Sequence, residues 1–156
     1  MGADVEFNGL ELIRRKHPTG ITSLAKIMAP ANWFTDDTQM TLFTAEGLIS
    51  SNIERALSGR PFINEFMHHA MLRWYATQGG VSRIETDLTT GLIQDNALWF
   101  VASPGMTCKQ ALRESRILGQ TADNDSKGCG TIMRVAPLAF GLSREDIREA
   151  AISTSA

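Results

Sequence analysis

The sequence has little cysteine, no long apolar run and almost no excess charge, and each shortage excludes a class of protein. Its 156 residues include two cysteines, Cys108 and Cys129, which form neither a disulfide framework nor a CxxC metal motif. No apolar run approaches the roughly 20 residues that span a bilayer. A net charge of −2 provides no basic surface for nucleic acid. We therefore expect a reduced, cytoplasmic protein that binds neither membranes nor nucleic acid.

The composition is that of a globular domain, and the spacing of its apolar residues is helical. Hydrophobic residues make up 43% of the chain and charged residues 21%, which is close to the globular average. Apolar residues at 40, 43, 47 and 48 predict a helix over residues 38–51. A four-residue apolar spacing predicts a second helix over residues 62–74.

Weaker signals complete the fold prediction. Thr107 is expected to cap a helix that runs to about Leu118, and Ser143 is expected to cap the last helix together with Asp146. Residues 121–130 are polar and contain glycine, so we expect a loop there. No stretch alternates in the manner of a strand. The sequence thus predicts an all-α protein with a length of about one domain.

Two neighbouring carboxylates, Asp36 and Asp37, stand where the first of these helices should begin. The positive end of the helix dipole offsets their repulsion, and one of them can cap the helix. Alternatively, the two carboxylates and the neighbouring hydroxyls supply oxygen ligands of the kind that Mg²⁺ prefers. The pair alone does not decide between a cap and half of a metal site.

A glycine-containing segment, residues 124–138, reads NDSKGCGTIMRVAPL. Gly128 and Gly130 allow the backbone to approach a ligand closely, and amides at the start of a helix bind anions such as pyrophosphate. The spacing is neither that of a Walker loop nor that of a Rossmann fingerprint. The segment therefore predicts either an anion-binding loop or a structural turn before a core helix.

Taken together, these segments resemble the ADP-ribosylglycohydrolase family. The family's first metal motif, W-[ST]-D-D-T-x-[ML], matches Trp33 and residues 35–40, with Phe34 inserted between them. Its glycine-rich loop followed by MR-[AV]-x-P-[LIV] matches residues 128–138. Residues 1–7 are similar to the second half of the family's opening segment, which ends in Glu-Phe. The resemblance covers essentially the whole chain, with the motifs in the right order.

The resemblance implies an orthogonal helical bundle that hydrolyses a glycosidic bond at the anomeric carbon of ADP-ribose, using two Mg²⁺ ions or, in some members, Mn²⁺. The substrate would be an ADP-ribosylated protein or a small ADP-ribose conjugate. The implied catalytic residues are Glu6, Asp36 and Asp37, and the implied metal ligands are Thr35, Asp36 and Asp37. The implied substrate-binding residues are Asn124, Ser126, Gly128, Gly130, Thr131 and Met133. Many members have Asn where this chain has Cys129, a poor hydrogen-bond partner.

The resemblance also implies that residues 1–156 are the N-terminal portion of a single ADP-ribosylglycohydrolase domain that is truncated at both ends. The family's Gly-Asp-Ala should precede Met1, and its Thr-His-x-His-Pro segment and Asp-x-Asp-[ST] metal motif should follow Ala156. We expect such a chain to be inactive alone. We also expect the apolar face of residues 62–74 to be exposed, because it would have packed on the missing helices.

Two other functions stay open at this point. The chain could be a non-catalytic ADP-ribose or nucleotide binding module, or a helical interaction domain in which the aspartates only cap a helix. The sequence specifies neither the linkage that is cleaved nor the oligomeric state. His68 and His69 point about 100° apart on a helix, so we expect one exposed and one partly buried side chain and no shared metal ion.

Overall fold

The computed structural model describes residues 5, 8–20, 34–60, 62–101, 104–126 and 128–153. The chain forms two compact units, residues 1–35 and 36–156. In the first unit, helix α1 (Leu10–Lys16) is short and exposes Arg14, which pairs with Glu11 one turn earlier. The second unit carries the features discussed below and is described by itself.

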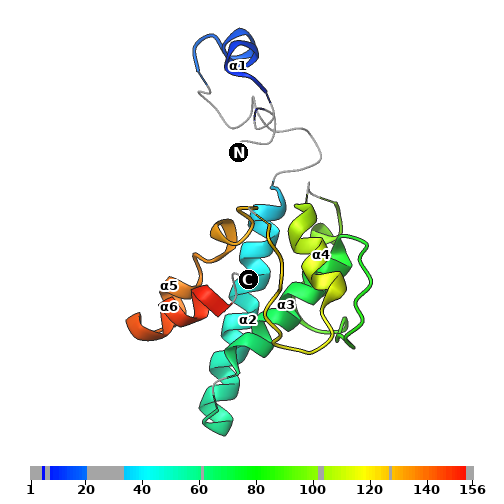
Figure 1. Ribbon diagram of the computed structural model, residues 1–156, viewed down its shortest axis with the longest axis vertical. Helices are drawn as coiled ribbons and strands as arrows, with labels where there is room; N and C mark the ends of the chain where they lie inside the picture. Colours follow the sequence, from blue (N-terminus) through cyan, green and yellow to red (C-terminus); the bar gives the residue numbers. More distant parts are fainter. Residues whose placement is uncertain are drawn as a thin grey trace. The chain divides into compact units, whose positions relative to one another are not determined.

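The described residues contain helices and no strand, which confirms the all-α prediction. In the second unit two long helices, α2 (Asp36–Ser58) and α3 (Ile63–Thr77), are followed by shorter ones. These are η2 (Gly91–Gln94), η3 (Asn96–Leu98), α4 (Met106–Glu114), η4 (Ile132–Arg134), α5 (Leu138–Gly141) and α6 (Arg144–Ser153). Figure 1 shows their order along the chain. None of the helices in the described part of the chain is long and apolar enough to cross a membrane.

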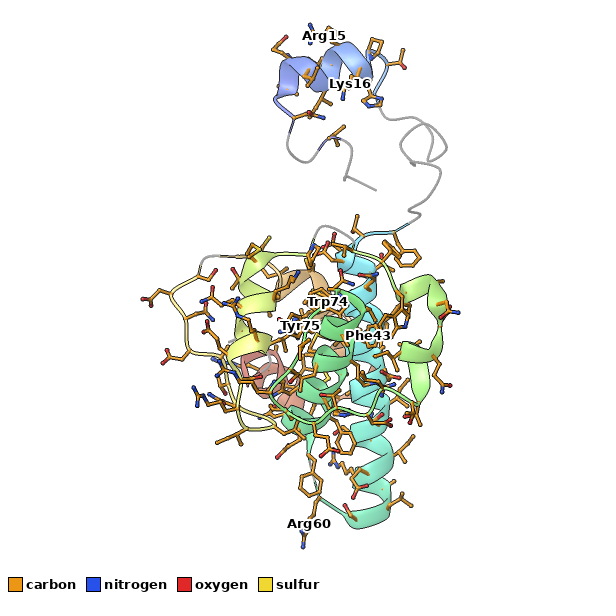
Figure 2. The ribbon with its side chains drawn as sticks, turned by 90° about the vertical axis from the view of Figure 1, so that its right-hand side faces the viewer. Arg15, Lys16, Phe43, Arg60, Trp74 and Tyr75 are labelled. Atoms are coloured by element: carbon orange, nitrogen blue, oxygen red, sulfur yellow. The ribbon has the colours of Figure 1, made fainter. Side chains whose placement is uncertain are left out.

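Helices α2 and α3 form an antiparallel pair that contains most of the core. Phe43 of α2 and Trp74 of α3 are fully buried, and Figure 2 shows both inside the unit. The helices approach closely at Gly47, where a Cβ atom would lie 2.9 Å from the carbonyl oxygen of Phe66. A larger residue at position 47 would therefore push the two helices apart.

The shorter helices pack around this pair. Helix α4 contacts α3, while η4 and α5 contact α2. A second core cluster joins Leu48 and Met67 to Leu138 of α5 and Ala150 of α6. The last helix begins as expected, because the Ser143 hydroxyl donates to the Asp146 carboxylate and accepts from the Asp146 amide.

Two expectations were wrong. Helix α4 begins after Gly105 and ends at Glu114, so Thr107 lies in its first turn and does not cap it. The helix stops early because Ser115 turns to an extended backbone conformation and its hydroxyl donates to the carbonyl of Leu112. The apolar face of residues 62–74 is also covered: Met67, Ala70, Met71 and Trp74 are at most 4% exposed, because α2 and the short helices pack on them.

Candidate active site

The first turn of α2 carries the two neighbouring carboxylates. Asp36 is only 8% exposed, whereas Asp37, the next residue, is exposed. Thr35 directly precedes them in the chain and is the last residue of the first unit. Glu6, the remaining predicted catalytic residue, lies outside the described residues. The structure therefore presents one buried and one accessible carboxylate at the start of a long helix.

The environment of Asp36 has opposing electrostatic effects. Burial raises the pKa of this carboxyl above its ordinary value of 3.8, and the neighbouring charge of Asp37 raises it further. Hydrogen bonds from the backbone amides of Asp36, Asp37 and Gly105 lower the pKa again. Gly105 directly precedes α4, so this hydrogen bond links the first turn of α2 to the start of α4. A cation beside the two carboxylates would relieve their mutual repulsion.

Gln39, one turn further along α2, holds this end of the helix in place. Its side chain is fully buried and makes four hydrogen bonds. The amide nitrogen donates to the carbonyls of Leu98 and Phe100, both at 3.2 Å. The amide oxygen accepts from the Trp74 indole at 3.3 Å and from the Gln78 side chain at 3.0 Å. Because every polar atom of Gln39 is satisfied, the register of α2 against α3 and residues 98–100 is fixed.

A cavity of about 600 Å³ opens beside α3 and α4, under the loop of residues 119–131. Five of the six predicted substrate-binding residues line it: Asn124, Ser126, Gly128, Gly130 and Thr131. The sixth, Met133, is not among the lining residues; its carbonyl accepts a hydrogen bond from Thr41 of α2 at 3.0 Å. We call this cavity the loop pocket.

The glycine-rich loop is tied to α4 through a pair of hydroxyl groups. Ser126 Oγ lies 2.6 Å from Thr107 Oγ1 and accepts from the amide of Gly128 at 3.2 Å. The amide of Ser126 donates to the Asn124 side chain at 2.9 Å. Ser126 and Asn124 thus shape the loop that lines the pocket, and Thr107 contributes to the same arrangement.

Cys108 of α4 connects the pocket to the start of α2. A Cβ atom at position 130 would lie 2.7 Å from Cys108 Sγ, so only glycine fits there without displacing the thiol. Burial raises the pKa of the Cys108 thiol, and the charge of Asp36 raises it further, whereas the Arg134 guanidinium lowers it. The Cys108 thiol is therefore within electrostatic reach of both the Asp36 carboxylate and the Arg134 guanidinium, and the thiol and the guanidinium line the loop pocket.

Sequence reasoning missed the part that His68 plays in this pocket. Both His68 and His69 are half-buried, so the expectation of one exposed histidine was wrong. His68 lines the loop pocket, and its two ring nitrogens form hydrogen bonds with Ser115 and Gly119, which follow α4. His69 accepts a hydrogen bond from the Asp87 amide at 3.3 Å. No signal in the sequence links His68 to partners so far along the chain.

The residues at the start of α2 suit a hard cation, as part of a ligand set. Two carboxylates offer oxygen atoms, the donors that Mg²⁺ and Mn²⁺ prefer. In the described part of the chain, no group of three or more histidine, cysteine, aspartate or glutamate side chains could hold a metal ion. Asp36 and Asp37 therefore fit as contributors to a metal site rather than as a complete one.

A comparison with protein-family models shows to which family the chain belongs. The model described as ADP-ribosylglycohydrolase matches residues 1–156. The chain belongs to the ADP-ribosylglycohydrolase family. This confirms the resemblance drawn from the two motifs and makes the protein a member of a glycohydrolase family. Neither the search of curated proteins nor the search of solved structures found a match.

Proposed function

We propose that this ADP-ribosylglycohydrolase removes ADP-ribose from a modified protein or a small ADP-ribose conjugate, with Mg²⁺ or Mn²⁺ as cofactor. The observation that carries the proposal is the link between the two motifs. The Asp36 carboxylate, at the start of α2, accepts from the amide of Gly105, and α4 leads from there to Cys108 beneath Gly130. The carboxylates and the loop pocket thus belong to one continuous region.

Each residue has a distinct role in the proposal. Asp36 and Asp37, with Thr35 before them, would hold the metal, and bound Mg²⁺ would activate water and orient the ribose hydroxyls. Asp36 is positioned by three backbone amides and by the fixed register of α2, so its carboxylate needs little reorganisation. Glu6 is the proposed general acid or base. The mutual repulsion of the carboxylates favours a bound cation.

The loop pocket is the proposed ADP-ribose site. Amides of a glycine-rich loop bind phosphate oxygens, and Gly128 and Gly130 both line the pocket. Arg134 lines the same pocket and can neutralise a phosphate. Ser126 and Asn124 hydrogen-bond the loop itself, so we assign them to shaping the site. Thr131 and Gly130 form part of the wall of the loop pocket.

The test is metal-dependent binding and turnover of ADP-ribose compounds. ADP-ribose should bind more tightly with Mg²⁺ than with EDTA, and Asp37→Asn should abolish that difference. Asp95→Asn is the matched control, because Asp95 is an exposed aspartate whose oxygen accepts from the amide of Ala97, a contact that asparagine keeps. Equal metal dependence in wild type and Asp37→Asn would reject the proposed ligands.

Release of ADP-ribose is then measured with arginine-linked and serine-linked substrates and with O-acetyl-ADP-ribose. Turnover on one of these identifies the linkage. Metal-dependent binding without turnover on any of them would favour the alternative, a non-catalytic ADP-ribose binding module.

A further inference from the structure

His68 stands out because both of its ring nitrogens form hydrogen bonds, and both partners are distant in the sequence. The amide of Gly119 donates to Nδ1 at 3.0 Å, and Nε2 lies 3.2 Å from the hydroxyl of Ser115. These partners lie 51 and 47 residues away in the sequence. The histidine thus joins the middle of α3 to the segment that follows α4.

The hydrogen bonds specify one form of the imidazole. Nδ1 accepts the amide proton of Gly119, so it carries no proton itself. The Ser115 hydroxyl donates to the carbonyl of Leu112 at 2.9 Å, so its oxygen accepts from Nε2. The chain of donors therefore runs from His68 Nε2 through Ser115 to Leu112. The ring is neutral, with its proton on Nε2.

The surroundings agree with a neutral ring. Burial lowers the pKa of His68 below 6.5, and the positive charges of His69 on α3 and Arg134 on η4 lower it further. Glu65 of α3 packs against Gly119, where a Cβ atom would lie 3.1 Å from its Cγ. Gly119 has a φ of +80°, so the turn around it also requires glycine.

The segment that His68 holds forms one wall of the loop pocket. Ser115, Gly119 and Gln120 all line the cavity, and the residues after them continue into the glycine-rich loop. The Gln120 side chain accepts from the amides of Arg116 and Ile117, which closes the turn on itself. The turn is thus closed by its own hydrogen bonds, and α3 contacts it at Gly119 through the packing of Glu65 and the hydrogen bond to His68.

We infer that His68 of α3 is a positioning residue that holds one wall of the ADP-ribose pocket, the segment after α4, through Ser115 and Gly119. The inference rests on the proposed function for the identity of the ligand. His68 itself is not required to touch the ligand. Its two hydrogen bonds hold this wall against α3 and so contribute to the preorganisation of the pocket.

The first experiment measures the affinity for ADP-ribose, in the presence of Mg²⁺, by calorimetry. His68→Leu removes both hydrogen bonds, and we expect the affinity to fall about tenfold, which corresponds to roughly 1.4 kcal/mol. His68→Asn keeps an acceptor near the position of Nδ1 and should stay within about threefold of wild type by the same conversion. His69→Leu is the matched control: it removes a half-buried histidine of the same helix that does not line the pocket.

The second experiment measures hydrogen exchange of the Gly119 amide, and one decisive result comes from the wild-type protein alone. We expect the amide to be protected in the wild-type protein and in His68→Asn, and to exchange faster in His68→Leu if that variant folds. Exchange in wild type at the rate of an unstructured amide would overturn the inference, whatever the variants do. Wild-type affinity in a folded His68→Leu would overturn it as well.

The two proposals fail separately. If wild type does not bind ADP-ribose with Mg²⁺, the proposed ligand is wrong, while the exchange of the Gly119 amide still tests whether His68 holds the turn. If wild type binds and His69→Leu weakens binding as much as His68→Leu, the effect is general destabilisation and the positioning role is rejected.

Discussion

Two loops pack on the α2–α3 pair, and they are held in different ways. The first loop, residues 80–101, places Ile93 and Leu98 in the core, each at most 4% exposed. The second loop, residues 116–131, has no buried residue among those that the structure describes. The first loop is held by buried apolar side chains as well as by hydrogen bonds, whereas the second is held by hydrogen bonds from individual side chains, with no buried residue of its own in the described part of the loop.

An ion pair strengthens the hold on the first loop. Arg73 Nη2 lies 3.2 Å from Glu46 Oε1, and both side chains are almost entirely buried. The same carboxylate oxygen accepts from the amide of Leu92 at 2.8 Å. The first loop therefore cannot leave the helices without exposing a buried charge pair and part of the core. The second loop can open locally at lower cost, as ligand-binding loops commonly do.

The largest effect should come from breaking the ion pair under the first loop. Arg73→Met leaves Glu46 charged and buried, and we expect a loss of about 3–5 kcal/mol in the free energy of unfolding. Urea denaturation measures it. The double variant Arg73→Met with Glu46→Leu should recover much of the loss, because no buried charge remains unpaired. A loss below about 1 kcal/mol for the single variant would fall in the range of surface pairs and contradict the comparison.

A smaller effect is expected at the second loop. Ser126→Ala removes the hydroxyl that joins Thr107 to the amide of Gly128. We expect a loss of about 0.5–1.5 kcal/mol in unfolding free energy, and a clearly weaker affinity for ADP-ribose. Ser82→Ala is the control, because the Ser82 hydroxyl accepts from the Ile84 amide in the first loop. Equal loss of affinity in both variants would remove the distinction between the loops.

The stability of the protein should depend on pH through two histidines, His69, which contacts the first loop, and His68, which contacts the second. The pKa values of His68 and His69 lie below 6.5 in the folded protein, mainly because of burial. The unfolded chain then binds protons first as the pH falls, so stability is complete above about pH 6.5 and declines below it. Thermal unfolding between neutral and mildly acidic pH measures the decline. His68→Asn and His69→Asn should each reduce the slope, and an unchanged slope in either would contradict its assignment.

The smallest effects are expected at the outer surfaces of the loops. Leu88 in the first loop is 43% exposed and Ile117 in the second is 70% exposed. Replacing either with Ser should change the unfolding free energy by no more than about 0.5 kcal/mol. A large loss for Ile117→Ser would mean that the second loop is held by apolar contact, and a large loss for Leu88→Ser would mean that the apolar hold on the first loop extends beyond Ile93 and Leu98.

The sequence predicts helices α2 and α3 and part of the loop pocket better than it predicts the end of α4 and the contacts of His68. The apolar periodicity predicts α2 and α3 because many residues contribute to each pattern. The motif resemblance predicts five of the residues that line the loop pocket. The end of α4 was missed because neither Gly nor Pro marks it; a hydroxyl bond from Ser115 to Leu112 does. His68 was missed because its partners lie 47 and 51 residues away, beyond any local pattern.

The cysteine at position 129, where many members of the family have asparagine, has a practical consequence. Cys129 is exposed in the glycine-rich loop, whereas Cys108, beneath Gly130, is half-buried and has a raised thiol pKa. A maleimide dye at neutral pH should therefore modify Cys129 first. The natural sequence thus carries a single preferred attachment point for a fluorophore, directly beside the proposed ligand, so occupancy of the pocket can be followed by fluorescence without engineering a cysteine.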